Sequence, residues 1–362
     1  MTEPVSPTEA FGTLSTYQKF LQKEGLPIIR GFHIDDLKTV EVQPWARKDA
    51  KGAYLNLEGT GDTNDAYICE IAPGKATDPQ RHLYEEVIFV VSGRGATSVW
   101  LDDNRKQTFE WGPGSLFSPP LNAWHQHFNG QGDQPARLFG VTTAPLVLDL
   151  FHNEKFVFNN DFLFDDRFSG EADYFGSQGK LYGVRLWETN FVPDVRRFKL
   201  MDLAERGAGG AGVVFEISNN TLCAHISEMP TRRYKKCHRH GPGAHVIIIG
   251  GEGYSFCYPA GGERQRVDWR DGSMFVPPDM WYYQHFNTSA EPARYLAIRW
   301  GGQKFRMPCM KTDVEGALSI VQRGNQIEYE DEDPIVYEIF KAALAKNGLE
   351  PDMAAFFPNR DL

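Results

Sequence analysis

The sequence predicts an all-β protein made of two tandem barrels, with short helices near the two ends, and three observations support this fold class. The first is an internal repeat, because a constant offset of 158 residues carries Gln80-Arg81-His82 onto His238-Arg239-His240. The second is that both copies consist of short segments rich in β-branched and aromatic residues, bounded by Gly and Pro. The third is that helical patterns lie mainly outside the repeat. Many short strands separated by turns are typical of a sandwich or barrel.

The repeat keeps one register over a long stretch of chain. No gap is needed from the pair Glu70/Glu228 to the pair Asn129/Asn287, and a shift of one residue then brings Arg137 onto Arg294. Chance does not hold a register for so long. The segments that we expect to be strands are 86–91, 96–100 and 115–117 in the first copy, and 245–249, 254–258 and 273–276 in the second.

The repeat divides the chain into five expected parts. They are an N-terminal extension (1–26), a first barrel (27–150), a linker (151–184), a second barrel (185–302) and a C-terminal helical extension (303–362). An amphipathic helix is predicted over 16–24. A second helix is predicted over 335–345, where Pro334 precedes it and Gly348 follows it, as is common at helix starts and ends.

Composition excludes several classes of protein. The net charge is −10 and no Lys/Arg cluster is present, which argues against a nucleic-acid partner because phosphate contacts need concentrated positive charge. No apolar run approaches the roughly 18 residues of a membrane span. Met1–Ala10 does not resemble a signal peptide. The five cysteines (Cys69, Cys223, Cys237, Cys257 and Cys309) include no CxxC pair, so we expect reduced thiols and a cytoplasmic protein.

Two patterns in each repeat resemble the motifs of the cupin superfamily. The first motif is Gly, five residues, His-x-His, three or four residues, Glu, six residues and Gly. The chain matches it, with Gln in place of the first His, at Gly74, Gln80, His82, Glu86 and Gly93. The second motif is matched at Gly114, Pro120, Asn122 (in place of Gly), His125 and Asn129. The resemblance covers roughly residues 27–150 and 185–302. It implies two jelly-roll barrels, a bicupin, with a divalent metal held among inward-facing histidines.

The second copy departs from the motifs in its own way. His238 and His240 supply the full His-x-His, whereas Ala244 replaces the Glu and Tyr283 replaces the second-motif His. Loss of the Glu beside an intact His-Arg-His is similar to gentisate-type ring-cleaving dioxygenases, which are also bicupins. This resemblance implies iron, O₂ and a small aromatic substrate.

Strand periodicity indicates which side chains in the first copy meet. Alternate residues of a strand share a face, which groups the residues of the first motif on one face and those of the second motif on another. If both faces point into the barrel, His82, Glu86 and His125 converge, with Gln80 as a fourth donor. Two His and one carboxylate suit Fe(II), with Mn(II), Ni(II) and Zn(II) as competitors. The two groups are Gln80, His82, Tyr84 and Glu86, and His125, His127 and Asn129.

The same reasoning predicts a weaker metal site in the second copy. His238 and His240 share a face, and either Tyr283 or His285 would complete the set. A neutral set of ligands holds a divalent ion less tightly than a set with a carboxylate. This set is neutral unless Tyr283 is ionised, and an unperturbed Tyr has a pKa of about 10.

These patterns favour a non-haem Fe(II) dioxygenase that binds a small aromatic or enolic substrate and O₂. His127 or Tyr84 would act as the acid or base, since both would line the same cavity. One alternative is a Zn(II)- or Mn(II)-dependent isomerase, lyase or decarboxylase. The other is a non-catalytic binding or storage bicupin. We also expect a homodimer, because open sheet edges need covering.

Overall fold

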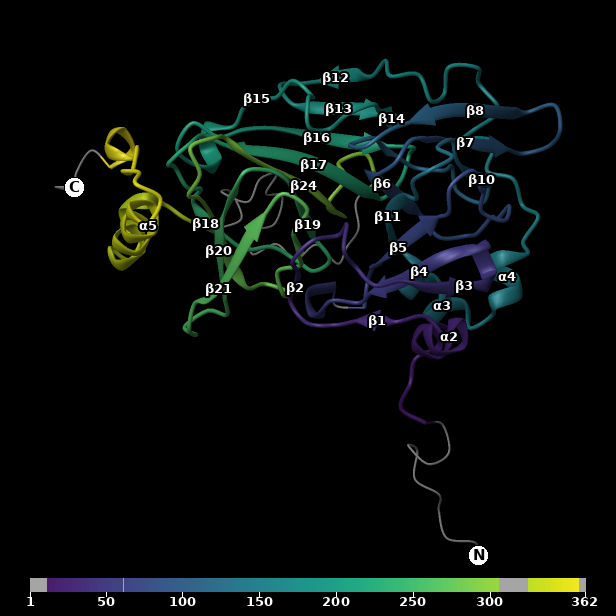
Figure 1. The fold of residues 1–362 in the computed structure, drawn as a ribbon, viewed down its shortest axis with the longest axis horizontal. Coiled ribbons are helices and arrows are strands. Elements are labelled where there is room, and N and C mark those ends of the chain that lie inside the picture. Colours follow the sequence, from purple (N-terminus) through teal and green to yellow (C-terminus); the bar gives the residue numbers. More distant parts are fainter. Residues whose placement is uncertain (1–11, 61, 306–324, 358–362) are drawn as a thin grey trace, which may run out of the picture.

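The computed structural model describes residues 12–60, 62–305 and 325–357, and it consists of two β-barrels side by side (Figure 1). The predicted all-β class is confirmed. In the first barrel a large sheet has the order β1-β4-β5-β11-β6-β9-β14, with β3 on β4, and a small sheet has the order β10-β7-β8. Its own strands are β1 (Ile28–Ile29), β3 (Gln43–Trp45), β4 (Ala50–Leu55), β5 (Asp65–Ile71), β6 (Glu86–Ser92), β7 (Gly95–Trp100), β8 (Lys106–Trp111), β9 (Leu116–Phe117), β10 (Trp124–Asn129) and β11 (Ala136–Thr142).

The second barrel repeats this plan. Its large sheet has the order β12-β13-β16-β17-β24-β19-β22-β2, with β15 on β16, and its small sheet has the order β21-β20-β23-β18-β25. Its own strands are β12 (Lys180–Tyr182), β13 (Leu186–Thr189), β15 (Met201–Asp202), β16 (Ala211–Ile217), β17 (Leu222–Met229), β18 (Cys237–His238), β19 (His245–Gly250), β20 (Glu252–Tyr258), β21 (Gln265–Arg270), β22 (Met274–Phe275), β23 (Tyr282–Asn287), β24 (Ala293–Trp300) and β25 (Gln326–Ile327).

The two barrels exchange strands at their junction. β2 (His33–Ile34) pairs with β22 of the second barrel, and β14 (Phe191–Val192) pairs with β9 of the first. The two large sheets also pack on each other, so that one apolar core joins residues such as Phe89 and Phe139 to Phe215 and Ile298. The barrels are therefore interleaved, and the expected domain bounds at 27, 150 and 185 stay a prediction.

Short helices surround the barrels. The predicted helix over 16–24 is α2 (Thr16–Glu24), which begins with a capping box between Ser15 and Gln18 and ends at Gly25 in the left-handed conformation. The predicted helix over 335–345 is α5 (Ile335–Ala345). Two further helices were not predicted, α3 (Ala144–Phe151) and α4 (Glu154–Phe158). The single-turn 3₁₀ helices are η1 (Ala46–Lys48), η2 (Glu58–Thr60), η3 (Ala204–Arg206), η4 (Tyr329–Asp331) and η5 (Ala354–Phe356).

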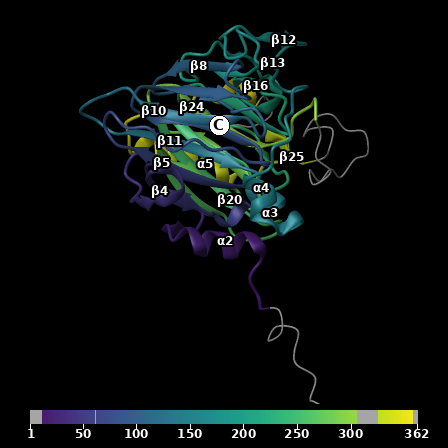
Figure 2. The same ribbon diagram turned by 90° about the vertical axis from the view of Figure 1, so that its right-hand side faces the viewer.

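Each group of helices belongs to one barrel. Figures 1 and 2 both place α2, α3 and α4 together beside the first barrel, where Phe20 of α2 stacks on Phe158 of α4 at 5.5 Å. α5 packs on the second barrel through Phe340, whose ring lies 5.0 Å from that of Tyr234. Among the described residues, no helix is long and apolar enough to cross a membrane.

A buried carboxylate ties the two barrels together. Glu85 of the first barrel accepts hydrogen bonds from the backbone N–H of Thr221 (2.9 Å) and Leu222 (3.0 Å) of the second, and from the Thr221 hydroxyl (3.0 Å). Arg167 lies 3.3 Å from the same carboxylate. The adjacent residue is Glu86, so this junction fixes the backbone at the start of β6.

Replacing Glu85 with alanine is expected to lower the free energy of unfolding by at least about 2 kcal/mol, because it leaves buried N–H donors without an acceptor. Urea denaturation monitored by circular dichroism measures this change. Glu154→Ala is the matched control, because Glu154 forms a largely exposed ion pair with Lys23 at 2.8 Å, which is worth only about 0–1 kcal/mol. Equal losses in the two variants would refute the role assigned to Glu85.

Candidate metal centre

The candidate metal ligands come from two chain segments, strand β10 and residues 80–86. His125 and His127 lie on β10, where alternate side chains are buried as periodicity predicted. Residues 80–86 do not form one continuous strand, and that expectation was wrong. Gln80 makes an isolated antiparallel bridge to His125, and the chain then bends before β6 begins at Glu86. The bend, rather than strand alternation, directs His82 and Glu86 toward the same point.

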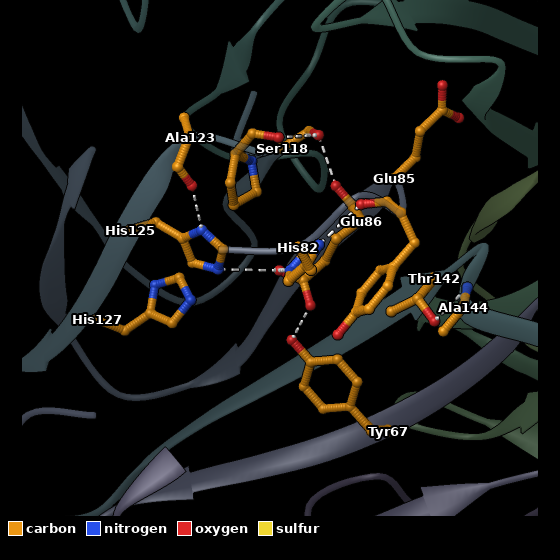
Figure 3. A network of polar contacts seen from close by, with 12 residues as sticks. Tyr67, His82, Glu85, Glu86, Ser118, Ala123, His125, His127, Thr142 and Ala144 are labelled. Carbon is orange, nitrogen blue, oxygen red and sulfur yellow. Dashed lines mark hydrogen bonds and ion pairs between the residues drawn. The ribbon is translucent and has the colours of Figure 1, made fainter. Parts of the chain in front are cut away.

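Three of the predicted residues converge in the interior of the first barrel. Glu86 Oε2 lies 3.7 Å from Nε2 of both His82 and His125, and one donor atom from each residue lies within 4.8 Å of the others (Figure 3). All three side chains are almost inaccessible to solvent. Two imidazoles and one carboxylate are donors that would suit a divalent metal such as Fe(II).

Hydrogen bonds determine which nitrogen of each ligand histidine carries the proton. Nδ1 of His82 lies 2.8 Å from the carbonyl oxygen of Tyr84, and Nδ1 of His125 lies 3.1 Å from that of Ala123. A carbonyl oxygen only accepts, so both rings donate from Nδ1–H and leave a lone pair on Nε2. Backbone carbonyls orient metal-binding imidazoles in this way in many proteins. Both lone pairs face Glu86.

A hydrogen bond and nearby charges likewise determine the state of the Glu86 carboxylate. Oε1 of Glu86 accepts a hydrogen bond from the Tyr67 hydroxyl at 2.6 Å, whereas Oε2 is buried without a partner. Burial alone would raise the pKa of Glu86, but Lys48, His82 and His125 together lower this pKa well below its usual range, so the group is ionised. Nε2 of His82 and His125 are also buried without a partner. Buried polar atoms are rarely left unpaired, and three that converge on one point fit a divalent cation.

Gln80 lies beside this set. Its backbone exchanges hydrogen bonds with His125, at 3.0 and 2.9 Å, and its Nε2 atom is buried without a partner. The backbone of Gln80 is thus paired with that of His125, and the role of the Gln80 side chain as a fourth donor stays a prediction.

His127 has the opposite proton arrangement from the ligand histidines. Its Nδ1 lies 2.8 Å from the Thr97 hydroxyl, which already accepts the indole N–H of Trp111 at 2.9 Å. A hydroxyl oxygen can accept twice, but Nδ1 of His127 is the only acceptor within reach of the Thr97 proton among the described residues, so we infer that the hydroxyl donates to Nδ1. The proton of His127 then lies on Nε2, which is buried, has no partner and belongs to the same cluster of rings, 5.6 Å from that of His125. Burial, with a contribution from Lys48, lowers the pKa of His127 to about 3, so the ring is neutral.

Tyr84 packs against His82, one of the candidate metal ligands. Its ring lies flat on that of His82, with centroids 3.7 Å apart, and its carbonyl oxygen holds Nδ1 of the same residue. Burial raises the pKa of its hydroxyl well above the usual value, with a further contribution from Glu86. These contacts position His82.

Sequence reasoning missed the buried lysine of the first barrel, Lys48 of η1. The side chain is 2% exposed, and its ammonium lies 4.6 Å from the ring centroid of Tyr67 and 4.9 Å from that of Trp45, with no hydrogen-bond partner. The 158-residue offset places Arg206 at the corresponding position of the second copy. A basic residue at both positions was therefore a detectable feature of the sequence.

The second barrel brings its predicted residues together differently. The Tyr283 hydroxyl donates to Nε2 of His240, whose Nδ1 donates to the carbonyl of Gly241 at 2.8 Å. The ring of His238 lies 4.1 Å from that of Tyr283. His285 repeats the arrangement of His127, with Ser255 and Trp269 in place of Thr97 and Trp111, at 2.8 and 2.9 Å. Among the His, Cys, Asp and Glu residues of the described ranges, only His82, Glu86 and His125 form a three-residue group with metal-binding spacing.

Comparisons with known proteins agree with this architecture. Residues 67–142 match the model of the cupin domain family Cupin_2. A segment of 101 residues is 36% identical to 5-aminosalicylate 1,2-dioxygenase of Comamonas sp, and this match spans 27% of the chain and only 25% of that relative. Residues 67–142 are thus a cupin domain, and this range contains His82, Glu86 and His125. Because the second barrel repeats its strand order and motif positions, the chain is a bicupin.

Similar solved structures include variants of Bacillus subtilis oxalate decarboxylase. A variant with a single serine-to-alanine substitution aligns with a TM-score of 0.49 and 12% identity over 75% of this chain and 79% of that one. A deletion variant of the same enzyme aligns with a TM-score of 0.48 and 13% identity over 75% of this chain and 77% of that one.

Proposed function

We propose that the first barrel binds Fe(II) through His82, Glu86 and His125, and that the protein is a dioxygenase that opens the ring of a small hydroxylated aromatic acid. The observation that carries this proposal is the set of three converging, buried and unpartnered donor atoms. The partial match to a dioxygenase of an aminosalicylate supports the substrate class. When bound, such a metal supplies Lewis acidity toward a ring hydroxyl and a redox centre for O₂.

The surrounding residues suit an anionic aromatic substrate. Lys48 is a buried ammonium without a partner, and a substrate carboxylate would compensate its charge. His127 presents an Nε2–H, which would donate a hydrogen bond to an oxygen of the substrate or of O₂. Its low pKa keeps the ring neutral, so His127 offers this single proton across the physiological pH range. We assign His127 as a hydrogen-bond donor to the substrate or to O₂, in place of the acid–base role expected from the sequence, and Tyr84 as a positioning residue.

Oxygen uptake tests the proposed reaction. Ring cleavage by O₂ places both oxygen atoms in the product and needs no external reductant. We expect the Fe(II)-loaded protein to consume one O₂ per molecule of gentisate, salicylate or 5-aminosalicylate, with loss of the aromatic absorbance. The absence of O₂ uptake with every hydroxylated aromatic acid in such a panel would contradict the proposal.

The donor set also favours a second candidate. Two His, one Glu and a nearby Gln suit Mn(II) or Zn(II) as well as Fe(II), and a metal-dependent decarboxylase, lyase or isomerase would use them without consuming O₂. Turnover of the same acids with Mn(II) or Zn(II) and no O₂ uptake would establish this candidate in place of the first.

We also propose that the protein is a cytoplasmic homodimer.

The hydroxyl of Thr97 is expected to be needed for the function of His127. Thr97→Val removes the donor that keeps the proton of His127 on Nε2, and we expect kcat to fall by roughly 10–100-fold, a loss similar to that seen when a hydrogen bond orienting a metal-site imidazole is removed. Metal content should not change, because Thr97 does not contact the ligands. Ser98→Ala is the matched control on the same strand, since Ser98 bonds to Thr108 at 2.7 Å. Equal activity in the two variants would reject the assignment of His127.

A further inference from the structure

The second barrel differs from the first at two facing positions, where alanine takes the place of the carboxylate and an arginine lies opposite it. In the first barrel Glu86 lies opposite Thr142 in the pairing of β6 with β11. In the second barrel His245 lies opposite Ile298 in the pairing of β19 with β24, and one further step in this register places Ala244 opposite Arg299. The position of the metal-binding carboxylate thus holds a methyl group, and a cation lies across from it.

Arg299 is one of three cations in this part of the barrel. Lys235 is 2% exposed, and its ammonium donates to the Ser227 hydroxyl and lies 5.3 Å from the ring centroid of Tyr295. That ring is 4.9 Å from the ring of His285. Arg206, at the position of Lys48, is half-buried. Burial lowers the pKa values of His238 and His285, and both Arg206 and Lys235 lower them further.

None of the three cations has a carboxylate partner among the described residues. Arg299 donates to Nδ1 of His225 (3.1 Å) and to the carbonyl oxygen of Trp300 (2.7 Å), and Arg206 donates to the side-chain oxygen of Gln326 (2.6 Å). Glu216, which pairs with Cys223 in the adjacent strands, instead accepts the backbone N–H of Gln303. Burying the Lys235 ammonium without a counterion is costly, and its burial, together with Arg206 and Arg185, lowers the pKa of Lys235 well below the usual range.

Two other arginines of the same barrel have carboxylate partners. Arg294, on the same strand as Arg299, lies 2.7 Å from Glu228, and Arg233 lies 2.7 Å from Asp352. A neutral hydrogen-bond donor also lacks a partner in the interior. Nε2 of His285 is buried and unpartnered. Nδ1 of His285 is the only acceptor within reach of the Ser255 hydroxyl among the described residues, and this hydroxyl accepts the indole N–H of Trp269, so we infer that it donates to Nδ1 and that the ring proton lies on Nε2.

We propose that the second barrel binds a small oxyanion, a carboxylate or a phosphate, between Arg299, Lys235 and Arg206, with the Nε2–H of His285 as a further donor. The guanidinium groups supply paired N–H donors that match carboxylate and phosphate oxygens. This site is independent of the proposed dioxygenase activity. It assigns the two barrels opposite charge preferences, a cation in the first and an anion in the second.

Isothermal titration calorimetry of the full chain with inorganic phosphate and with benzoate tests the proposal, and the probe that binds more tightly identifies the class of anion. The variants take the residues of the first barrel, so that Arg299→Thr copies Thr142 and Lys235→Thr copies Thr77. We expect both substitutions to weaken binding at least about tenfold, which is about 1.4 kcal/mol. Arg299→Lys keeps the charge but not the paired donors, and its affinity should lie between those of the wild type and Arg299→Thr.

Two controls separate this site from the first barrel. Arg266→Gln removes an exposed arginine that pairs with Asp268 at 2.7 Å, and it should bind the anion like the wild type. Arg299→Thr should retain the metal content of the wild type, and circular dichroism checks that each variant is folded. The proposal is overturned if the wild type binds neither probe. It is also overturned if the folded Arg299→Thr and Lys235→Thr variants bind as tightly as the wild type.

Discussion

Replacing Glu86 with glutamine is expected to remove most of the metal from the first barrel. The substitution keeps the shape of the side chain and its contact with Tyr67, but it removes the only negative charge among His82, Glu86 and His125. Removing a residue that hydrogen-bonds to a metal ligand costs roughly 10–100-fold in metal affinity. The loss of a charged ligand itself should exceed this range. His125→Ala should have an effect at least as large, because it deletes one of the two imidazole donors.

Elemental analysis of the purified variants, followed by equilibrium competition with a chelator, measures this loss. His33→Ala is the control, because His33 is an exposed histidine of the same half of the chain, with a side chain that is 47% exposed. We expect the control to keep the metal content of the wild type. Metal content equal to that of the wild type in both Glu86→Gln and His125→Ala would eliminate the proposed centre.

The paired variants His82→Ala and His240→Ala are expected to separate the functions of the barrels. His82 directs a lone pair at Glu86, whereas His240 accepts the Tyr283 hydroxyl in a barrel that has Ala244 in place of the carboxylate. His82→Ala should therefore reduce turnover by about a hundredfold or more, as expected for loss of a metal ligand. His240→Ala should retain turnover within a few-fold.

Steady-state oxygen uptake by the two variants, each loaded with Fe(II), provides the comparison. Thermal melts establish that both variants are folded at the assay temperature. Loss of turnover in His240→Ala with normal turnover in His82→Ala would reverse the assignment and make the second barrel the catalytic one.

The repeat and the strand periodicity predicted which residues form the site better than they predicted how those residues are arranged in space. On β10 alternation correctly placed His125 and His127 on one face. For residues 80–86 the same rule was wrong, because the chain bends between the bridge at Gln80 and the start of β6. The motif spacing still indicated His82 and Glu86, since the resemblance depends on sequence distance and not on strand geometry.

Other features depend on contacts between residues that are distant in sequence. β2 and β14 contain two residues each and cross between barrels, and such short segments have no periodicity to detect. The contact of Thr97 with both Trp111 and His127 joins three strands, and its effect on the ring proton requires coordinates. The burial of Lys48 likewise follows from the packing of η1 beside Tyr67.

Anomalous X-ray scattering at the iron absorption edge, on crystals of the protein loaded with Fe(II), tests the central claim most directly. We predict a single strong peak per chain, about 2.0–2.2 Å from Nε2 of His82, Nε2 of His125 and Oε2 of Glu86. A peak among His238, His240 and Tyr283 instead, or no peak within bonding distance of Glu86 in the loaded protein, would contradict it.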